Sequence, residues 1–162
     1  MKEIKLTQGK VALVDDSNYD RLISMGKWYA QKSRNGVFYA CKKVAGSDGK
    51  FRFLSMHRFL AGINDWSVKV DHANGDGLAN RMSNIRLSTN SQNLMNRGKT
   101  SLNSSGYKGV TWSKKGKAFY ASITHNKKTI HLGTFNDKVS AAIAYNAAAI
   151  QFHGEFAKLN QI

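Results

Sequence analysis

The sequence predicts an α+β protein built from short antiparallel strands. The first observation is that turn signals made of Gly, Asn, Asp and Ser separate the β-rich runs, in a chain that has no proline. The second is that helical spacing is confined to a few segments, the clearest of which is Ala-rich and nearly uncharged. With 162 residues, the chain is long enough for one average domain or two small ones.

The N-terminal half is predicted to be mostly antiparallel strands. Asp15, Asp16 or Ser17 offers an N-cap for one short helix, and Asn-Gly between two β-rich runs is a strong hairpin signal. Two strands are predicted within 4–14, around Gln8-Gly9, and a helix is predicted over 18–26, ending at Gly26. A hairpin follows, with strands over 28–33 and 37–44 and a turn at Arg34-Asn35-Gly36. After a turn at Ser47-Asp48-Gly49, another strand is predicted over 51–62.

The middle of the chain has the local order strand, loop, strand, helix. KVDHAN (69–74) and IRLST (85–89) are predicted strands, joined by a long polar loop. NSQNLMN (90–96) is a predicted helix, capped by Thr89 or Asn90. We expect a first domain over residues 1–96, with this core at about 68–96.

The C-terminal part predicts a second domain over residues 107–160, after a small, polar and basic linker at 97–106. Three strands are predicted at 107–112, 117–124 and 128–135, with turns at 114–116 and 126–128. A helix follows from Asn136 or Asp137 to about His153, and Gly154 ends it. A narrow stripe of that helix can pack on the sheet: Ala141, Tyr145, Ala148, Ala149 and Phe152.

Charge indicates the class of partner. Lys and Arg outnumber Asp and Glu by 25 to 10, which gives a net charge of +15 and attracts polyanions. No apolar run approaches 18 residues, no secretory signal is visible at the start, and the clear helix is not basic, so nucleic acid is favoured over a membrane. Cys41 is the only cysteine, which excludes intramolecular disulfides and Cys-ligated zinc and fits a cytoplasmic protein.

The dipeptide Asp71-His72, followed by a Gly-Asp-Gly loop, suggests phosphodiester hydrolysis. A neutral imidazole is a good base near pH 7, because its pKa is about 6.5. The oxygens of Asp71 and Asn93 favour one hard cation, Mg²⁺ or Mn²⁺, over zinc. Adjacent strand residues point to opposite faces, so the two side chains can share a site only where the strand ends or twists.

These residues resemble the HNH endonuclease motif, in the H-N-N form of homing endonucleases from phages and their introns. The resemblance rests on VDH at 70–72, NGD at 74–76, NIRL at 84–87 and Asn93, with LTQGKVALVD, KWYA and SMHR upstream. It implies a ββα-metal fold, with His72 as general base and Asp71 and Asn93 as metal ligands. It also implies that Asn84 braces the loop and orients His72. Asn93 stands where the pattern often has His, and an amide holds metal less strongly.

Three other polar residues of this half have simpler interpretations. Asp76 and Asn80 are more often loop-forming than ligating. His57 is predicted to lie on a strand beside Arg58, with a structural role favoured over a phosphate contact.

The C-terminal segment resembles the plant ethylene-response-factor (Apetala-two) DNA-binding domain over nearly its whole length. The matching stretches are SGYKGVTW, YASI, HLGTF, SAAIAYNAAA and GEFAKLN. The resemblance implies a three-stranded sheet, backed by one helix, that lies in the DNA major groove. The DNA contacts expected from the domain itself are Lys108, Trp112, Lys114, Lys117, Tyr120, Ser122, Thr124 and Lys128. Those expected from the linker are Arg97 and Lys99. Alternation places Lys108 and Trp112 on one side of the sheet, and packing is an equal alternative for Trp112. Thr111 stands where Arg is common and the segment has no Arg, so bidentate guanine recognition is weakened.

Together these patterns predict a metal-dependent, site-directed endonuclease acting on double-stranded DNA in a phage-infected or bacterial cell. A monomer with one site would nick one strand per binding event. One alternative is a DNA-binding regulator with an inactive nuclease unit. Another is an RNA-binding protein, which needs exposed aromatic side chains for base stacking, whereas the aromatics here mostly fall at alternating, core-like positions.

Overall fold

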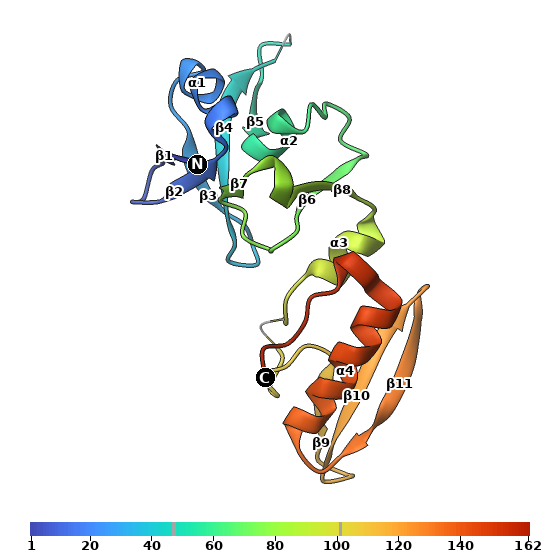
Figure 1. Ribbon diagram of the computed structural model, residues 1–162. Coiled ribbons are helices and arrows are strands. Elements are labelled where there is room, and N and C mark those ends of the chain that lie inside the picture. Colours follow the sequence, from blue (N-terminus) through green and yellow to red (C-terminus); the bar gives the residue numbers. More distant parts are fainter. Residues whose placement is uncertain (47, 101) are drawn as a thin grey trace. The chain divides into compact units, whose positions relative to one another are not determined.

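The computed structural model describes residues 1–46, 48–100 and 102–162 and separates into two compact units, Met1–Asn90 and Ser91–Ile162 (Figure 1). Both mix strands and helices, so the predicted α+β class is confirmed. Ser47 lies outside the described residues. The predicted turn around it is therefore described only at Asp48 and at Gly49, whose N–H donates to the Gly46 carbonyl.

The first unit contains three small sheets. Its elements are β1 (Lys2–Lys5), β2 (Val11–Val14), α1 (Asp16–Ser24), β3 (Tyr29–Lys32), β4 (Phe38–Ala45), β5 (Phe51–Ser55), α2 (Met56–Leu60), β6 (Lys69–His72), β7 (Ala79–Asn80), the 3₁₀ turn η1 (Met82–Asn84) and β8 (Ile85–Ser88). The strand orders are β1-β2-β7, β3-β4-β5 and β6-β8. Among the described strands of this unit, only the β2–β7 pair is parallel.

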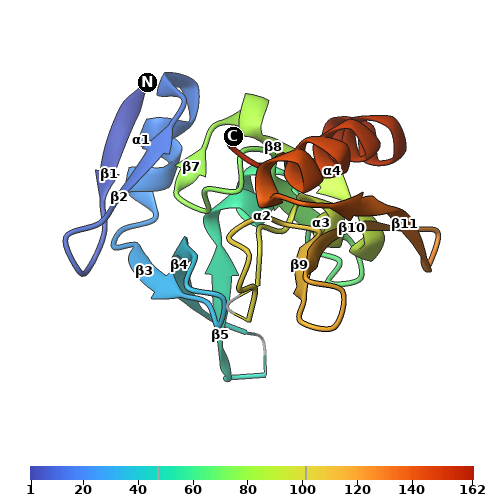
Figure 2. The same cartoon turned by 90° about the horizontal axis from the view of Figure 1, so that it is seen from below.

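One core joins the first two of these sheets. Leu22 of α1, Met56 of α2 and Ala40 of β4 pack with Trp28, which is 1% exposed. The Trp28 indole N–H donates to the Leu22 carbonyl at 2.9 Å, so the buried ring leaves no polar atom unpaired. Figure 2 shows α1 alongside β1 and β2.

The prediction of one strand over 51–62 is wrong beyond Ser55. Strand β5 ends opposite Cys41, and the next five residues form α2 instead. Met56 and Leu60 are spaced by one helical turn, and both bury their side chains in the core. Burial of this apolar pair outweighs the strand pattern of the preceding residues. His57 therefore lies on a helix and not on a strand.

The parallel pair β2–β7 was not predicted. Leu13 pairs with Ala79 and Val14 pairs with Asn80, which ties an early strand to the loop after His72. Asp15 strengthens this tie. It holds the N-cap position of α1 but caps nothing with its side chain, and its carboxylate accepts instead from the Met82 N–H at 2.7 Å.

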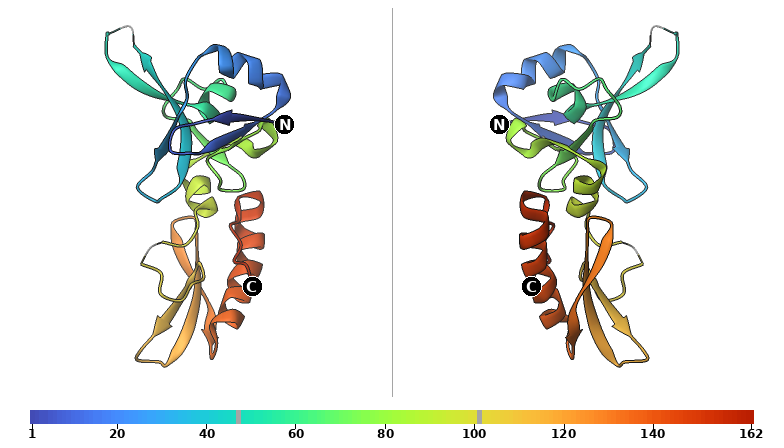
Figure 3. Two further views of the ribbon diagram at one scale, coloured as in Figure 1. Left: turned by 90° about the vertical axis from the view of Figure 1, so that its left-hand side faces the viewer. Right: turned by 90° about the vertical axis from the view of Figure 1, so that its right-hand side faces the viewer.

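The second unit contains a three-stranded sheet and a long helix where the sequence predicts such elements. Its elements are α3 (Asn90–Asn96, which begins at the unit boundary), β9 (Val110–Ser113), β10 (Ala118–His125), β11 (Lys128–Phe135), α4 (Lys138–His153) and the 3₁₀ turn η2 (Gly154–Phe156). The sheet order is β11-β10-β9, all antiparallel. Figure 3 shows α4 running along one face of this sheet.

Small residues let α4 lie close to that sheet. Ala141 and Ala142 are fully buried against Val110 and Ala121. Gly109 has a φ of 74°, and a Cβ there would overlap the ring of Tyr145, so only glycine fits. Asp137 caps α4 as predicted, accepting from the N–H groups of Val139 and Ser140. Among the described residues, no helix has the length and apolar character needed to cross a membrane.

Candidate active site

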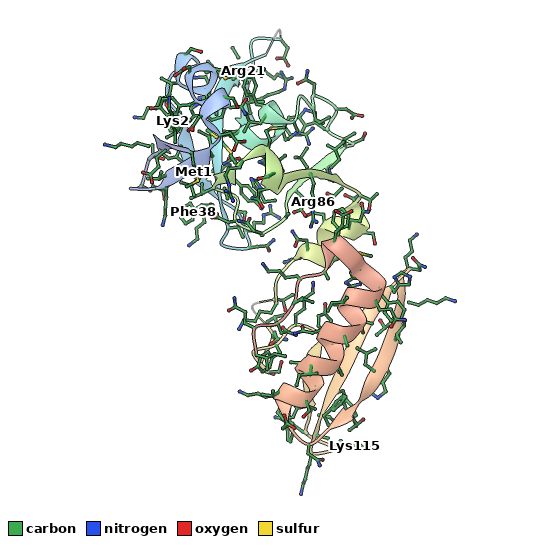
Figure 4. All side chains as sticks on the ribbon, in the orientation of Figure 1. Met1, Lys2, Arg21, Phe38, Arg86 and Lys115 are labelled. Atoms are coloured by element: carbon green, nitrogen blue, oxygen red, sulfur yellow. The ribbon has the colours of Figure 1, made fainter. Side chains whose placement is uncertain are left out.

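The candidate site lies at the end of the two-stranded sheet β6–β8. Asp71 is directly opposite Arg86 and His72 is opposite Ile85. Arg86, labelled in Figure 4, donates from Nη2 to Asp71 Oδ2 at 3.2 Å, with both side chains largely buried. This ion pair compensates the negative charge that Asp71 brings into the interior.

The imidazole of His72 is buried, at 3% exposure, and is held by an amide. His72 Nε2 lies 3.2 Å from Oδ1 of Asn80, a residue with no exposed surface. The amide is oriented because Asn80 Nδ2 donates to the Gly77 carbonyl. An amide oxygen only accepts, so the neutral ring carries its proton on Nε2 and Nδ1 becomes its basic nitrogen.

Asn84 braces the loop that carries these groups. Its Oδ1 accepts from the Asn74 N–H at 3.0 Å, and its Nδ2 donates to Asn74 Oδ1 and to the Ala79 carbonyl. Ala73 follows His72 in the chain, and its N–H donates to the Asn84 carbonyl. In the same loop, the Asp76 carboxylate accepts from the Leu78 N–H, so Asp76 is loop-forming, as predicted. The loop thus forms one network of amides, which accounts for its high Asn content.

Two further rings enclose His72. Its centroid lies 4.8 Å from that of His57, edge to face, and 5.9 Å from that of Tyr39. Gly77 lies so close to Tyr39 that a Cβ there would come within 2.6 Å of the ring. Burial lowers the pKa of His57 to about 3, and the neighbouring His72 and Arg58 act in the same direction. A buried, neutral His57 agrees with the structural role favoured from the sequence.

Electrostatics keep His72 neutral as well. Burial lowers the pKa of His72 below 6.5, and this outweighs the opposite effects of Asn80, Asp71 and Asp76. A ring that is neutral below pH 7 can accept a proton, which is what a general base needs.

The oxygen donors of a metal site are few. Asp71 is the one carboxylate beside His72 in the β6 strand, and Arg86 partly neutralises it. Among the described residues, no three His, Cys, Asp or Glu side chains gather in a way that could hold an ion. One carboxylate with amide oxygens is chemically suited to a hard, weakly held cation and not to zinc. Asn93 lies on α3 and belongs to the second unit.

The second unit presents a polar sheet face on the side away from α4. Ala121 and Ile123 point toward the helix, so alternation turns Tyr120, Ser122 and Thr124 to the other face. His131 of β11 is opposite Ser122, and its ring lies 5.6 Å from that of Tyr120. Thr111 is opposite Tyr120 and shares this face.

Trp112 and Lys108 occupy positions that favour packing over a DNA contact. Trp112 is opposite Phe119, with ring centroids 4.7 Å apart, so it lies on the helix-bearing side at the sheet edge. Lys108 precedes β9, and its amine donates to the Met95 carbonyl. Its backbone is held by the amide of Asn160. Burial and Lys158 lower the pKa of Lys108 to about 8, which fits a packing role better than a phosphate contact.

The other cationic candidates lie in turns or near the linker. Lys114 and Lys117 flank the turn before β10, and Lys128 opens β11 after a turn at Asn126-Lys127. Arg97 follows α3, and Lys99 donates to the Gly106 carbonyl at 3.1 Å. Ser105, within the predicted linker, is buried and donates to the Val110 carbonyl. The end of the linker therefore packs with the start of the sheet.

Sequence reasoning missed two features. It favoured a loop-forming role over a ligating one for Asn80 and did not connect it with His72; spacing alone could not reveal a contact eight residues away. It also expected aromatic side chains mostly at core-like positions. Several are exposed instead: Tyr29, Phe51, Phe53 and Trp66 in the first unit and Trp112 in the second.

Comparison with known proteins identifies the class. Over 146 residues, the chain is 31% identical to an uncharacterized HNH endonuclease of Acanthamoeba polyphaga mimivirus, covering 87% of this chain and 70% of that protein. It is also 28% identical over 89 residues to Protein 3.8 of Escherichia phage T7, covering 55% of this chain and 73% of that protein. No family model matches. With this similarity and the loop network around His72, the chain belongs to the HNH endonuclease family.

Proposed function

We propose that the protein is a metal-dependent, site-directed endonuclease of the homing type that nicks one strand of double-stranded DNA. The observation that carries the proposal is the buried His72, neutral and held through Nε2 by the Asn80 amide. A nucleophile-activating base needs a fixed tautomer and a fixed orientation, and the braced loop of amides around His72 supplies both.

In this mechanism the chain's own residues position and move one proton. His72 Nδ1 takes a proton from the attacking water, while Asn80 keeps the other nitrogen protonated and Asn84 holds the loop. Asp71 and Asn93 would hold one Mg²⁺ or Mn²⁺, which supplies Lewis-acid stabilisation of charge on the phosphate. Arg86 fixes the Asp71 carboxylate and lowers its net charge, which agrees with weak ion binding completed by DNA and water.

The second unit is proposed to bind the DNA duplex as an ethylene-response-factor-like domain over 107–160. The face formed by Tyr120, Ser122 and Thr124 would lie in the major groove, and Lys114, Lys117 and Lys128 would contact phosphates. Arg97 and Lys99 would contact the backbone from the linker at 97–106. Residues 101–162 carry 8 Lys and no Arg, so phosphate contacts outweigh base recognition and sequence preference is loose.

Nicking follows from one catalytic site per chain in a monomer. The test is a supercoiled-plasmid assay in Mg²⁺ or Mn²⁺ that compares the full-length protein with His72→Ala. The matched control is His125→Ala, which removes a partly exposed histidine of the second unit whose ring packs on Phe152 of α4, away from the proposed DNA-binding face.

Relaxed circles from the wild type and the control, with none from His72→Ala, support the proposal. Linear product at the earliest times would show that the protein cuts both strands, and nicking would no longer be the proposed reaction. Tight duplex binding without any cutting on host and phage DNA would favour the alternative, a regulator with an inactive nuclease unit.

A further inference from the structure

One face of the β3-β4-β5 sheet exposes aromatic rings. The register places Tyr29, Lys43, Phe51 and Phe53 on the same side of the three strands, and these four residues are called the aromatic face below. Phe51 is 64% exposed, Phe53 is 50% exposed and Tyr29 is 39% exposed. The opposite side of the sheet buries Ala30 and Ala40, so the sheet already has its core on that side. The exposed rings are therefore not needed for folding.

Cations are interleaved with these rings. Lys43 Nζ lies 4.4 Å from the centroid of Phe51, and Lys43 is directly opposite Phe53. Lys27 Nζ lies 5.6 Å from the centroid of Tyr29. No acidic residue occurs at any position of β3, β4 or β5. Asp48 is the one acidic residue between β4 and β5 in the sequence, and it pairs with Arg52. The side chain of Arg52 belongs to the opposite side of the sheet. The surface is thus both aromatic and positively charged.

The aromatic face and the candidate site lie on the same side of one strand. Tyr39, Cys41 and Lys43 alternate on that side of β4, and the Tyr39 ring lies against His57 and His72, while Cys41 between Tyr39 and Lys43 is covered, at 3% exposure. Four residues of strand span about 13 Å. Successive nucleotides of one strand are about 3.4 Å apart in a duplex. A stacked DNA strand that leads from His72 around the covered Cys41 would reach Lys43 and Phe53 at least about four nucleotides from the cut.

We propose that the aromatic face stacks unpaired bases of the DNA strand beside the scissile phosphate. The substrate would therefore be locally melted or mismatched DNA rather than an uninterrupted duplex. Phe has no hydrogen-bonding group with which to read base edges, and a paired duplex hides the faces of its bases. Stacking on aromatic side chains strengthens binding roughly 5- to 150-fold per base when the bases are unpaired. The lysines hold the backbone while the rings hold the bases.

A second copy of the chain does not fit this surface, because lysines would face lysines in a protein with a net charge of +15. The inference rests on the proposed nuclease function, because that function places the cut beside the aromatic face. The experiment that measures stacking does not depend on it. Stacking is detectable without metal and without any cutting.

The test uses a duplex carrying 2-aminopurine at one of four central positions, which are either fully paired or opened as a bubble. Fluorescence and binding are measured with the full-length protein in the absence of metal. We expect quenching and at least tenfold tighter binding for the bubble. Phe51→Ala with Phe53→Ala should abolish both effects while leaving affinity for the paired duplex unchanged. Arg52→Gln is the matched control, because it alters the same strand on its opposite side.

Equal affinity of the wild type for both substrates, or full quenching by the double variant, overturns the inference. Tighter binding to single-stranded RNA of the same sequence would also overturn it, because the surface would then serve RNA. If the wild-type protein quenches 2-aminopurine in the bubble but nicks no DNA, the nuclease proposal alone is refuted. Normal nicking without any bubble preference would refute the stacking proposal alone.

Discussion

The two units bury different kinds of side chain. In the second unit the helix α4 and its sheet enclose Ala141, Ala142, Ala149 and Val110, and the buried polar residues are spread along the chain. Among the described residues of the first unit, the buried polar ones fall between positions 57 and 84, in α2 and around the loop after β6. They are His57, Arg58, Asp71, His72, Asn80 and Asn84.

This difference fits the roles proposed for the two units. A surface that binds DNA through lysines can be built outside an apolar core, so the second unit leaves its interior simple. A proton-transferring site needs groups held away from water, where burial shifts the pKa of an imidazole and amides fix its tautomer. Buried polar groups are costly unless they are hydrogen-bonded, so the first unit supplies a network of Asn side chains.

The largest expected effect comes from breaking that network at Asn80. Asn80→Leu has a similar size but no acceptor for His72 Nε2, so we expect a loss of about 100-fold in nicking rate with DNA affinity unchanged. Asn80→Asp keeps an oxygen acceptor and is the matched control. Single-turnover nicking, with ¹⁵N NMR of the His72 tautomer, distinguishes positioning from unfolding. A normal rate in Asn80→Leu would remove Asn80 from the mechanism.

The second prediction concerns the surface of the other unit. Replacing Lys114, Lys117 and Lys128 together by Gln should weaken duplex binding. The slope of log affinity against log salt should fall by about 0.9 for each lysine that contacts a phosphate. Nicking at saturating DNA should stay normal, since none of the three lies in the first unit. An unchanged salt slope would place the duplex on another surface.

The third prediction uses the buried His57. Its pKa is about 3 in the folded protein and about 6.5 when unfolded, so the unfolded chain binds more protons between these values. The stability from its neutral form is fully present above pH 6.5 and declines toward pH 3, by up to about 1.4 kcal/mol per pH unit. Between pH 4 and 6, the free energy of unfolding measured in urea should rise less steeply with pH in His57→Gln than in the wild type. A flatter slope in the control His131→Gln would contradict this assignment.

The smallest effect is expected at the cap of α4. Asp137→Ala removes the acceptor for the N–H groups of Val139 and Ser140 and should destabilise the second unit by about 1 kcal/mol. Asn136→Ala, one residue earlier, is the control. Thermal unfolding gives the measurement, and nicking by the folded variant should remain at the wild-type level. Loss of nicking below the melting temperature would show that the two units are more interdependent than this comparison implies.

The sequence predicted the sheet and the long helix of the second unit, because their signals are local. Strand limits, the cap at Asp137 and the stop at Gly154 all follow from neighbouring residues. In the first unit, local patterns predicted β6, β8 and the loop between them. They could not predict α2, whose helix depends on burying Met56 and Leu60 in a core formed by distant segments. They also could not predict β7 or the Asn80–His72 contact, because both depend on tertiary pairing.

The parallel pair β2–β7 has a consequence for the order of folding. Val14 pairs with Asn80, so the residue that holds His72 is itself held by a strand 66 positions earlier in the chain. Such a contact closes a long loop, which is slow and entropically unfavourable until other contacts have formed. During synthesis, the hairpin of β1 and β2 precedes the loop that completes the site. The nuclease site is therefore among the last parts to mature, and a defect in the first 15 residues would silence it without changing any catalytic side chain.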